Sequence, residues 1–168
     1  MYSVELEKAE QLSEEELRTG IHLWVIHADK IPPHIGISRN GLFYSLKIHG
    51  KDTGIPSDKI LRVLIQKEIP VIVFRTSENS LRFQTLSEVY DQYEKIRPAE
   101  NSCLTPISHL YFGEPKDLIL EELLDLLLMA GVLEDVYKLN LKEDFKGIPE
   151  YTRTDIKNHI ENLLYAEG

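Results

Sequence analysis

Three side chains able to take part in acyl-transfer chemistry are spread along the chain. His34 and His49 flank an Asn-Gly dipeptide, and Cys103 is the only cysteine. A cysteine thiolate attacks carbonyl carbons, and a nearby imidazole removes the thiol proton. A second polar group that holds the imidazole fixes its tautomer. These residue types predict a thiol site with Cys103 as nucleophile, His34 as base and His49 as the group that orients the base.

A β-hairpin is needed to bring the two histidines together. The Asn-Gly pair at 40–41 is a favoured two-residue turn, because both positions tolerate a positive φ. Strands are expected on either side, over 34–38 and 42–48. The pairing that this turn imposes puts His34 and His49 on one face as diagonal neighbours.

Cys103 is expected at, or just before, the start of a short helix that runs to Phe112. A helix N-terminus lowers the pKa of a thiol, and its free backbone N–H groups stabilise an oxyanion. Thr105-Pro106 is itself a good cap and first position, which would begin the helix two residues after Cys103. Both starting points remain open at this stage.

The residues around the turn resemble the histidine hairpin of papain-like thiol enzymes. The hairpin reads His-Ile-Gly-Ile-Ser, then Asn-Gly, then Leu-Phe-Tyr-Ser-Leu over 34–46. NlpC-like hydrolases carry such a hairpin. The cysteine follows the histidines here, which is the chain order of the circularly permuted branch, the lecithin–retinol acyltransferase-like enzymes.

This resemblance covers about residues 21–112. It implies a papain-like fold and a thiol hydrolase or acyltransferase that acts on an amide, ester or peptide bond. It also implies the same roles for Cys103, His34 and His49. The helix and strand expected over 57–74 depart from the family, in which several consecutive strands would be typical.

The wider pattern predicts one α+β domain over residues 1–168, because a chain of this length fits a single core. We expect a small antiparallel-rich sheet packed by helices, with a core over about 20–112 and a helical C-terminal extension over about 115–168. Further strands are expected over 21–27, 69–74 and 80–83; helices over 4–18, 57–67, 85–96, 115–130 and 154–165; a polar loop over 50–56; and a linker over 138–153.

Composition excludes several classes of function. Acidic residues outnumber basic ones 28 to 19, and the basic residues are scattered, so no nucleic-acid surface is expected. Apolar runs are too short for a membrane span, and residues 1–15 lack the pattern of a signal peptide. The expected location is the cytoplasm. No cofactor is expected, and the leucine-rich C-terminal helices serve either core packing or a homo-oligomer.

Other interpretations of the same residues remain open. A lone cysteine is commonly a small buried hydrophobe, and histidines at strand ends are commonly packed or solvated. The chain would then be a non-catalytic interaction or assembly module on a similar scaffold. A metal site is disfavoured because His22 and His27 point to opposite faces of one strand. The substrate, a small molecule or a peptide, is left open.

Overall fold

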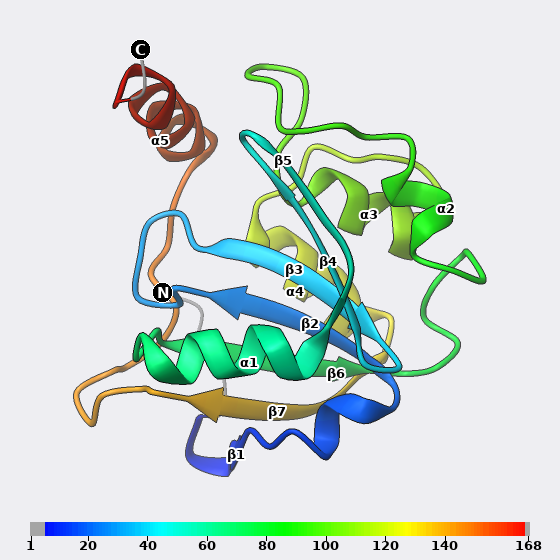
Figure 1. Ribbon diagram of the computed structural model, residues 1–168, viewed down its shortest axis with the longest axis vertical. Helices are drawn as coiled ribbons and strands as arrows, with labels where there is room; N and C mark the ends of the chain where they lie inside the picture. Colours follow the sequence, from blue (N-terminus) through cyan, green and yellow to red (C-terminus); the bar gives the residue numbers. More distant parts are fainter. Residues whose placement is uncertain (1–5, 167–168) are drawn as a thin grey trace.

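A seven-stranded mixed sheet forms the centre of the computed structural model, which describes residues 6–166 (Figure 1). The strand order is β1-β7-β6-β2-β3-β4-β5, and among the strands of the described residues only the β1–β7 pair is parallel. The strands are β1 (Glu10–Gln11), β2 (Ile21–Ile26), β3 (His34–Arg39), β4 (Leu42–Lys47), β5 (Gly50–Pro56), β6 (Val71–Thr76) and β7 (Leu133–Leu139). The helices are α1 (Ser57–Gln66), α2 (Ser87–Tyr90), α3 (Thr105–Phe112), α4 (Leu120–Met129) and α5 (Arg153–Ala166). The predicted α+β class and antiparallel-rich sheet are confirmed.

Helices cover the central strand β2 on both sides, and all six of its residues are buried. Leu23 and Val25 join a core cluster with the apolar faces of α3 and α4. Trp24 joins a second cluster with Phe43 and the apolar face of α1. Figure 1 shows α1 on one side of the sheet and α3 and α4 on the other. The apolar residues on both faces of this strand therefore reflect a three-layer arrangement.

The predicted hairpin of β3 and β4 is confirmed. Arg39 pairs with Leu42 across the turn, and Asn40 and Gly41 have φ values of 49° and 82°. Gly36 lies directly against the Phe43 ring, where an added Cβ would sit 2.4 Å from Cζ. The turn and this close contact together fix the register of the hairpin.

Three strands, β1, β5 and β7, lie in segments where the sequence predicts none. The expected polar loop over 50–56 is wrong, since these residues form β5, paired with β4 at the edge of the sheet. An edge strand needs one paired side only, which is why polar residues are tolerated there. The C-terminal extension is also not purely helical, because β7 lies between β1 and β6. In β7 only Tyr137 and Leu139 are buried, so the alternation of buried and exposed residues that marks a strand is weak.

The expected helix over 4–18 is wrong in its described part, and residues 4–5 lie outside the described residues. Two short 3₁₀ turns flank β1 instead. Leu12 and Leu17 pack into the core cluster on the α1 side. Glu16 accepts hydrogen bonds from Arg75 Nη1 at 2.6 Å and His22 Nε2 at 3.1 Å. These tertiary contacts outweigh the helix propensity of the segment.

Other boundaries differ because side chains occupy the helix ends. The expected helix over 85–96 is one turn, α2, whose last carbonyl accepts a hydrogen bond from Lys51 Nζ. No strand forms over 80–83. The expected start of α4 at Pro115 is wrong: the helix begins at Leu120, where Glu122 caps the Ile119 N–H. The ranges expected for α1, α3 and α5 are confirmed to within a few residues.

Helix α5 stands away from the sheet, beyond one end of the β4–β5 hairpin (Figure 1). Ile160 is its only fully buried side chain. Arg153 ties its first turn to the preceding part of the chain, by hydrogen bonds to the carboxylates of Asp117 and Glu122. Over residues 6–166, no helix has both the length and the apolar character needed to cross a membrane.

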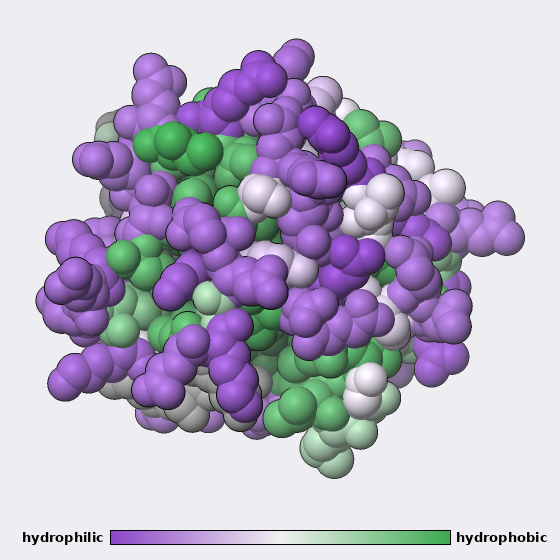
Figure 2. Space-filling view, turned by 90° about the horizontal axis from the view of Figure 1, so that it is seen from below, coloured by the Kyte–Doolittle hydropathy of each residue, from purple (hydrophilic) through white to green (hydrophobic). Residues whose placement is uncertain are grey.

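Large apolar side chains are exposed at the end of α4 and along α5. Met129 is 84% exposed, and Leu128 and Tyr165 are also prominent. Seen from below, the surface is mainly hydrophilic, with apolar side chains gathered in a few patches (Figure 2). The homo-oligomer through the C-terminal helices stays a prediction.

Candidate active site

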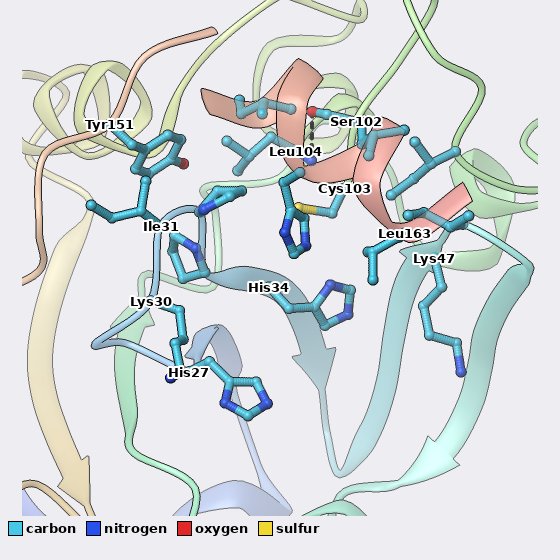
Figure 3. A pocket seen from close by; sticks show the side chains of 17 residues that line it. His27, Lys30, Ile31, His34, Lys47, Ser102, Cys103, Leu104, Tyr151 and Leu163 are labelled. Atoms are coloured by element: carbon cyan, nitrogen blue, oxygen red, sulfur yellow. Dashed lines mark hydrogen bonds between the residues drawn. The ribbon is translucent and has the colours of Figure 1, made fainter. Parts of the chain in front are cut away.

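A cavity of about 540 Å³ lies where the β2–β3 loop, the end of β4, the turn before α3 and helix α5 meet (Figure 3). This volume is within the usual range for small-molecule sites. Most of its lining is apolar. The lining residues are His27, Lys30, Ile31, Pro32, Pro33, His34, Lys47, Ile48, Ile96, Ser102, Cys103, Leu104, Tyr151, Ile156, His159, Ile160 and Leu163.

The structure brings together two of the three predicted site residues. Cys103 and His34 both line this cavity, although they lie far apart in the sequence. His49 does not line it. Strand β4 ends at Lys47, which pairs with Gly50, so His49 is exposed in the tight turn between β4 and β5. The regular β3–β4 pairing that would have put His49 beside His34 is shown only as far as Ile37.

His34 and Cys103 approach the cavity from different sides of β3. Ile35 belongs to the core cluster on the α3–α4 side, against which Cys103 also packs. His34 pairs with Ile26, which belongs to the cluster on the α1 side. Directly paired residues share a face of the sheet, so the His34 side chain leaves the strand opposite to Ile35. Among the described residues, no hydrogen bond joins Cys103 to His34.

The thiol of Cys103 is held in its protonated form. Burial raises its pKa to about 11, and only the backbone N–H groups of Ile35 and of Cys103 itself favour the thiolate. Histidine is absent from the groups that act on this thiol in the described part of the chain. A nucleophile in this setting needs a base to take its proton as it attacks.

The turn before α3 uses most of its N–H groups locally. Helix α3 begins at Thr105, which confirms the later of the two expected starting points. The Ser102 N–H donates to Thr105 Oγ1 at 2.8 Å. The Leu104 N–H donates to Ser102 Oγ at 3.2 Å (Figure 3). These bonds hold Cys103 in place. The backbone N–H groups of Ile35 and of Cys103 itself face the sulfur, and either could donate to an oxyanion formed there.

His34 is a neutral imidazole with one unused nitrogen. Its Nε2 atom is buried and lacks a hydrogen-bond partner in the described structure. Burial is the main cause that lowers the pKa of His34 to about 4. Among nearby charges, Asp52 raises this pKa, whereas Lys47, His27 and His159 lower it. A neutral imidazole near pH 7 has the protonation state of a general base.

Asp52 is a residue that the sequence analysis missed. Its carboxylate accepts hydrogen bonds from Ser45 Oγ and Lys47 Nζ, both at 2.9 Å. It is the charged group with the largest effect on the pKa of His34. Asp52 lies on β5, which the sequence predicts as a loop, so no pattern in the sequence placed it near His34.

The side chains around the cavity do not form a metal centre. His27, His34 and His159 all line it. However, no group of three or more His, Cys, Asp or Glu side chains within residues 6–166 is placed to hold a metal ion. The cavity therefore offers a thiol, imidazoles and ammonium groups as its chemistry.

Comparisons with protein-family models, curated proteins and solved structures give no match for this chain. The function is therefore inferred from the chemistry of the cavity itself.

Proposed function

We propose that this chain is a cysteine-dependent hydrolase or acyltransferase that acts on an amide, ester or peptide bond, on a permuted papain-like scaffold. One observation carries the proposal. Cys103 and His34 come from distant parts of the sequence and line the same ligand-sized cavity. The lone cysteine alone would not support a site, but it shares the cavity with an imidazole whose buried Nε2 has no partner in the described structure.

The chemistry begins from a neutral pair. The pKa of Cys103, about 11, keeps the thiol protonated, and the pKa of His34, about 4, keeps the imidazole unprotonated. The thiol proton therefore moves to His34 only as the sulfur attacks, as in general-base catalysis. This step requires the two side chains to come into contact at the end of β3 when a substrate occupies the cavity.

The proposed reaction has two balanced steps. The Cys103 sulfur forms a bond to the carbonyl carbon, its proton passes to His34, and the carbonyl electron pair moves onto oxygen. The tetrahedral intermediate then expels the amine or alcohol, which takes the proton from His34, and leaves an acyl group on Cys103. Water, or an acceptor alcohol or amine, then attacks the acyl carbon while His34 takes its proton. The bond to sulfur breaks, the acyl group leaves with the acceptor, and the Cys103 sulfur takes the proton back from His34.

Asp52 takes the part first expected of His49. A carboxylate near the imidazole stabilises the imidazolium that forms during attack. Asp52 already raises the pKa of His34, and Ser45 and Lys47 hold it in position.

The raised pKa of Cys103 and the lack of a hydrogen bond to His34 favour a second function. A protonated thiol without a contacting base is chemically inert at neutral pH. The cavity would then hold a small molecule without reacting with it, and the chain would be a non-catalytic binding or interaction module.

Acylation of the protein distinguishes the two functions. The full chain is incubated with p-nitrophenyl butyrate, while nitrophenol release is followed by absorbance and the attached butyryl group by mass spectrometry. The hydrolase proposal expects a butyryl group on Cys103, no such adduct on Cys103→Ala, and a rate lower by about 10²-fold in His34→Ala. An unmodified wild-type protein with the nitrophenol rate of Cys103→Ala would establish the non-catalytic function.

A further inference from the structure

The cavity has a charge character opposite to that of the whole chain. The chain carries 28 acidic and 19 basic residues, for a net charge of −9. The lining of the cavity includes Lys30 and Lys47, but no Asp or Glu side chain. The cavity therefore offers ammonium groups to an anion in an otherwise acidic protein.

The two lysines differ in how their charge is used. Lys47 donates a hydrogen bond to Asp52 at 2.9 Å, and its side chain is 50% exposed. Lys30 is exposed, and within residues 6–166 its ammonium group forms no ion pair or side-chain hydrogen bond. Lys30 is therefore the ammonium group that remains open to a ligand.

Apolar and cationic groups occupy different ends of the cavity. Figure 3 shows Tyr151, Leu104 and Leu163 on the side nearer to the Cys103 sulfur. Lys30 and Lys47 lie on either side of His34, and their ammonium groups point away from that apolar side. Ile156, Ile160 and Leu163 of α5 extend the apolar wall. The cavity is thus amphipathic, with the thiol and His34 between its two ends.

We infer that the cavity takes an amphipathic carboxylate of the N-acyl amino acid class, with its acyl chain against the α5 wall and its carboxylate at Lys30. This inference rests on the proposed function for the position of the amide carbonyl near Cys103. The apolar chain accounts for the wall, and the carboxylate accounts for Lys30, an ammonium group in the lining that has no acidic partner within residues 6–166. A neutral acyl amide would leave the Lys30 charge unused.

Equilibrium binding to the Cys103→Ala protein tests the inference without turnover. The probes are N-decanoylglycine and the uncharged N-decanoylglycinamide, measured by isothermal titration calorimetry at low salt. We expect the carboxylate to bind about tenfold more tightly, because hydrogen bonds to charged groups stabilise a complex by ~1.5 kcal/mol or more. Added salt should reduce this preference. The Lys30→Met variant should abolish it, and the distant Lys67→Met variant should keep it.

Each outcome separates the inference from the proposed function. Equal binding of the two probes, or a carboxylate preference that survives the loss of Lys30, would overturn the inference. Absence of measurable binding by either probe would overturn it as well. A carboxylate preference in a protein whose Cys103 is never acylated would support the inference and refute the hydrolase. Acylation of Cys103 without a carboxylate preference would do the opposite.

Discussion

The backbone N–H of Ile35 faces the sulfur of Cys103 and lowers the pKa of its thiol. Strand β3 therefore meets the thiol through the residue that follows His34, not through the imidazole. Ile35 and Cys103 both lie on the α3–α4 side of the sheet. Cys103 and His34 thus share a cavity, but the His34 side chain leaves β3 on the face of the sheet opposite to Ile35 and Cys103. The reactivity of this cysteine depends on whether the end of β3 lets the two side chains meet.

Alkylation of Cys103 measures the state of the thiol directly. Because the pKa is raised to about 11, the rate of reaction of the free protein with iodoacetamide should keep rising above the ordinary thiol pKa of ~8.5. Rates are followed by mass spectrometry across this range in wild type and His34→Ala. An alkylation rate that has already reached its plateau near neutral pH in wild type, and that loses its low-pH arm in His34→Ala, would show a thiolate–imidazolium pair instead.

Protonation of His34 should destabilise the protein in acid. The pKa of His34 is about 4 in the folded chain and about 6.5 when unfolded, so between these values the unfolded state binds the extra proton. Stability should therefore fall as the pH is lowered from about 6.5 to about 4, by about 3 kcal/mol. The groups that face this imidazole are Asp52, Lys47, His27 and His159.

Urea unfolding at several pH values checks this prediction. His34→Gln should flatten the loss of stability over that window, because glutamine does not titrate. Lys67→Gln, at the exposed end of α1, is the control and should retain the slope of the wild type, because lysine does not titrate in this window. Equal slopes in wild type and His34→Gln would show that His34 titrates normally in the folded protein.

Gly36 should not tolerate alanine. A Cβ at this position would lie 2.4 Å from Cζ of Phe43, a buried ring that also packs edge-on against Trp24. Overpacking of this kind costs about 1–3 kcal/mol. Thermal or urea unfolding of Gly36→Ala gives the loss. Combination with Phe43→Leu should recover part of it, and strictly additive losses would contradict the contact.

Loss of Arg153 should loosen α5 over the cavity. The Arg153 guanidinium bonds to the Asp117 carbonyl and to the carboxylates of Asp117 and Glu122, while Ile160 is the only fully buried residue of the helix. Arg153→Ala should increase hydrogen exchange in α5 and the rate at which a bulky maleimide reaches Cys103. Arg97→Ala, which removes a local pair with Glu94, should change neither. Unchanged exchange in Arg153→Ala would show that the apolar contacts alone hold the helix.

Short-range patterns predicted the parts of the fold that local chemistry dictates. The Asn-Gly turn fixed the β3–β4 hairpin because positive φ values at both positions admit few other residues. The apolar run of β2 and the amphipathic patterns of α1 and α5 predicted the bounds of this strand and these helices to within a few residues. The predicted loop at β5 was wrong because the polar residues of an edge strand resemble those of a loop.

Tertiary contacts decided the segments in which local preference is weak or misleading. The expected helix over residues 4–18 gave way to β1 and short turns because Glu16 bonds to Arg75, a residue distant in sequence. Strand β7 formed in the C-terminal part because its backbone completes the sheet between β1 and β6. Arg75 is far from Glu16 in the sequence, and β1 and β6 are far from β7, so a pattern of neighbouring residues cannot reveal these contacts.

The sequence by itself determined that Cys103 lies at, or just before, the start of a helix and that His34 opens a hairpin strand, because caps and turns are local. Only the tertiary structure placed the two residues in one cavity, removed His49 from it and brought Asp52 toward His34. It also decided the protonation of the pair, since burial raises the pKa of the thiol and lowers that of the imidazole. Burial and electrostatic environment are properties of the packed chain, and a residue pattern does not contain them.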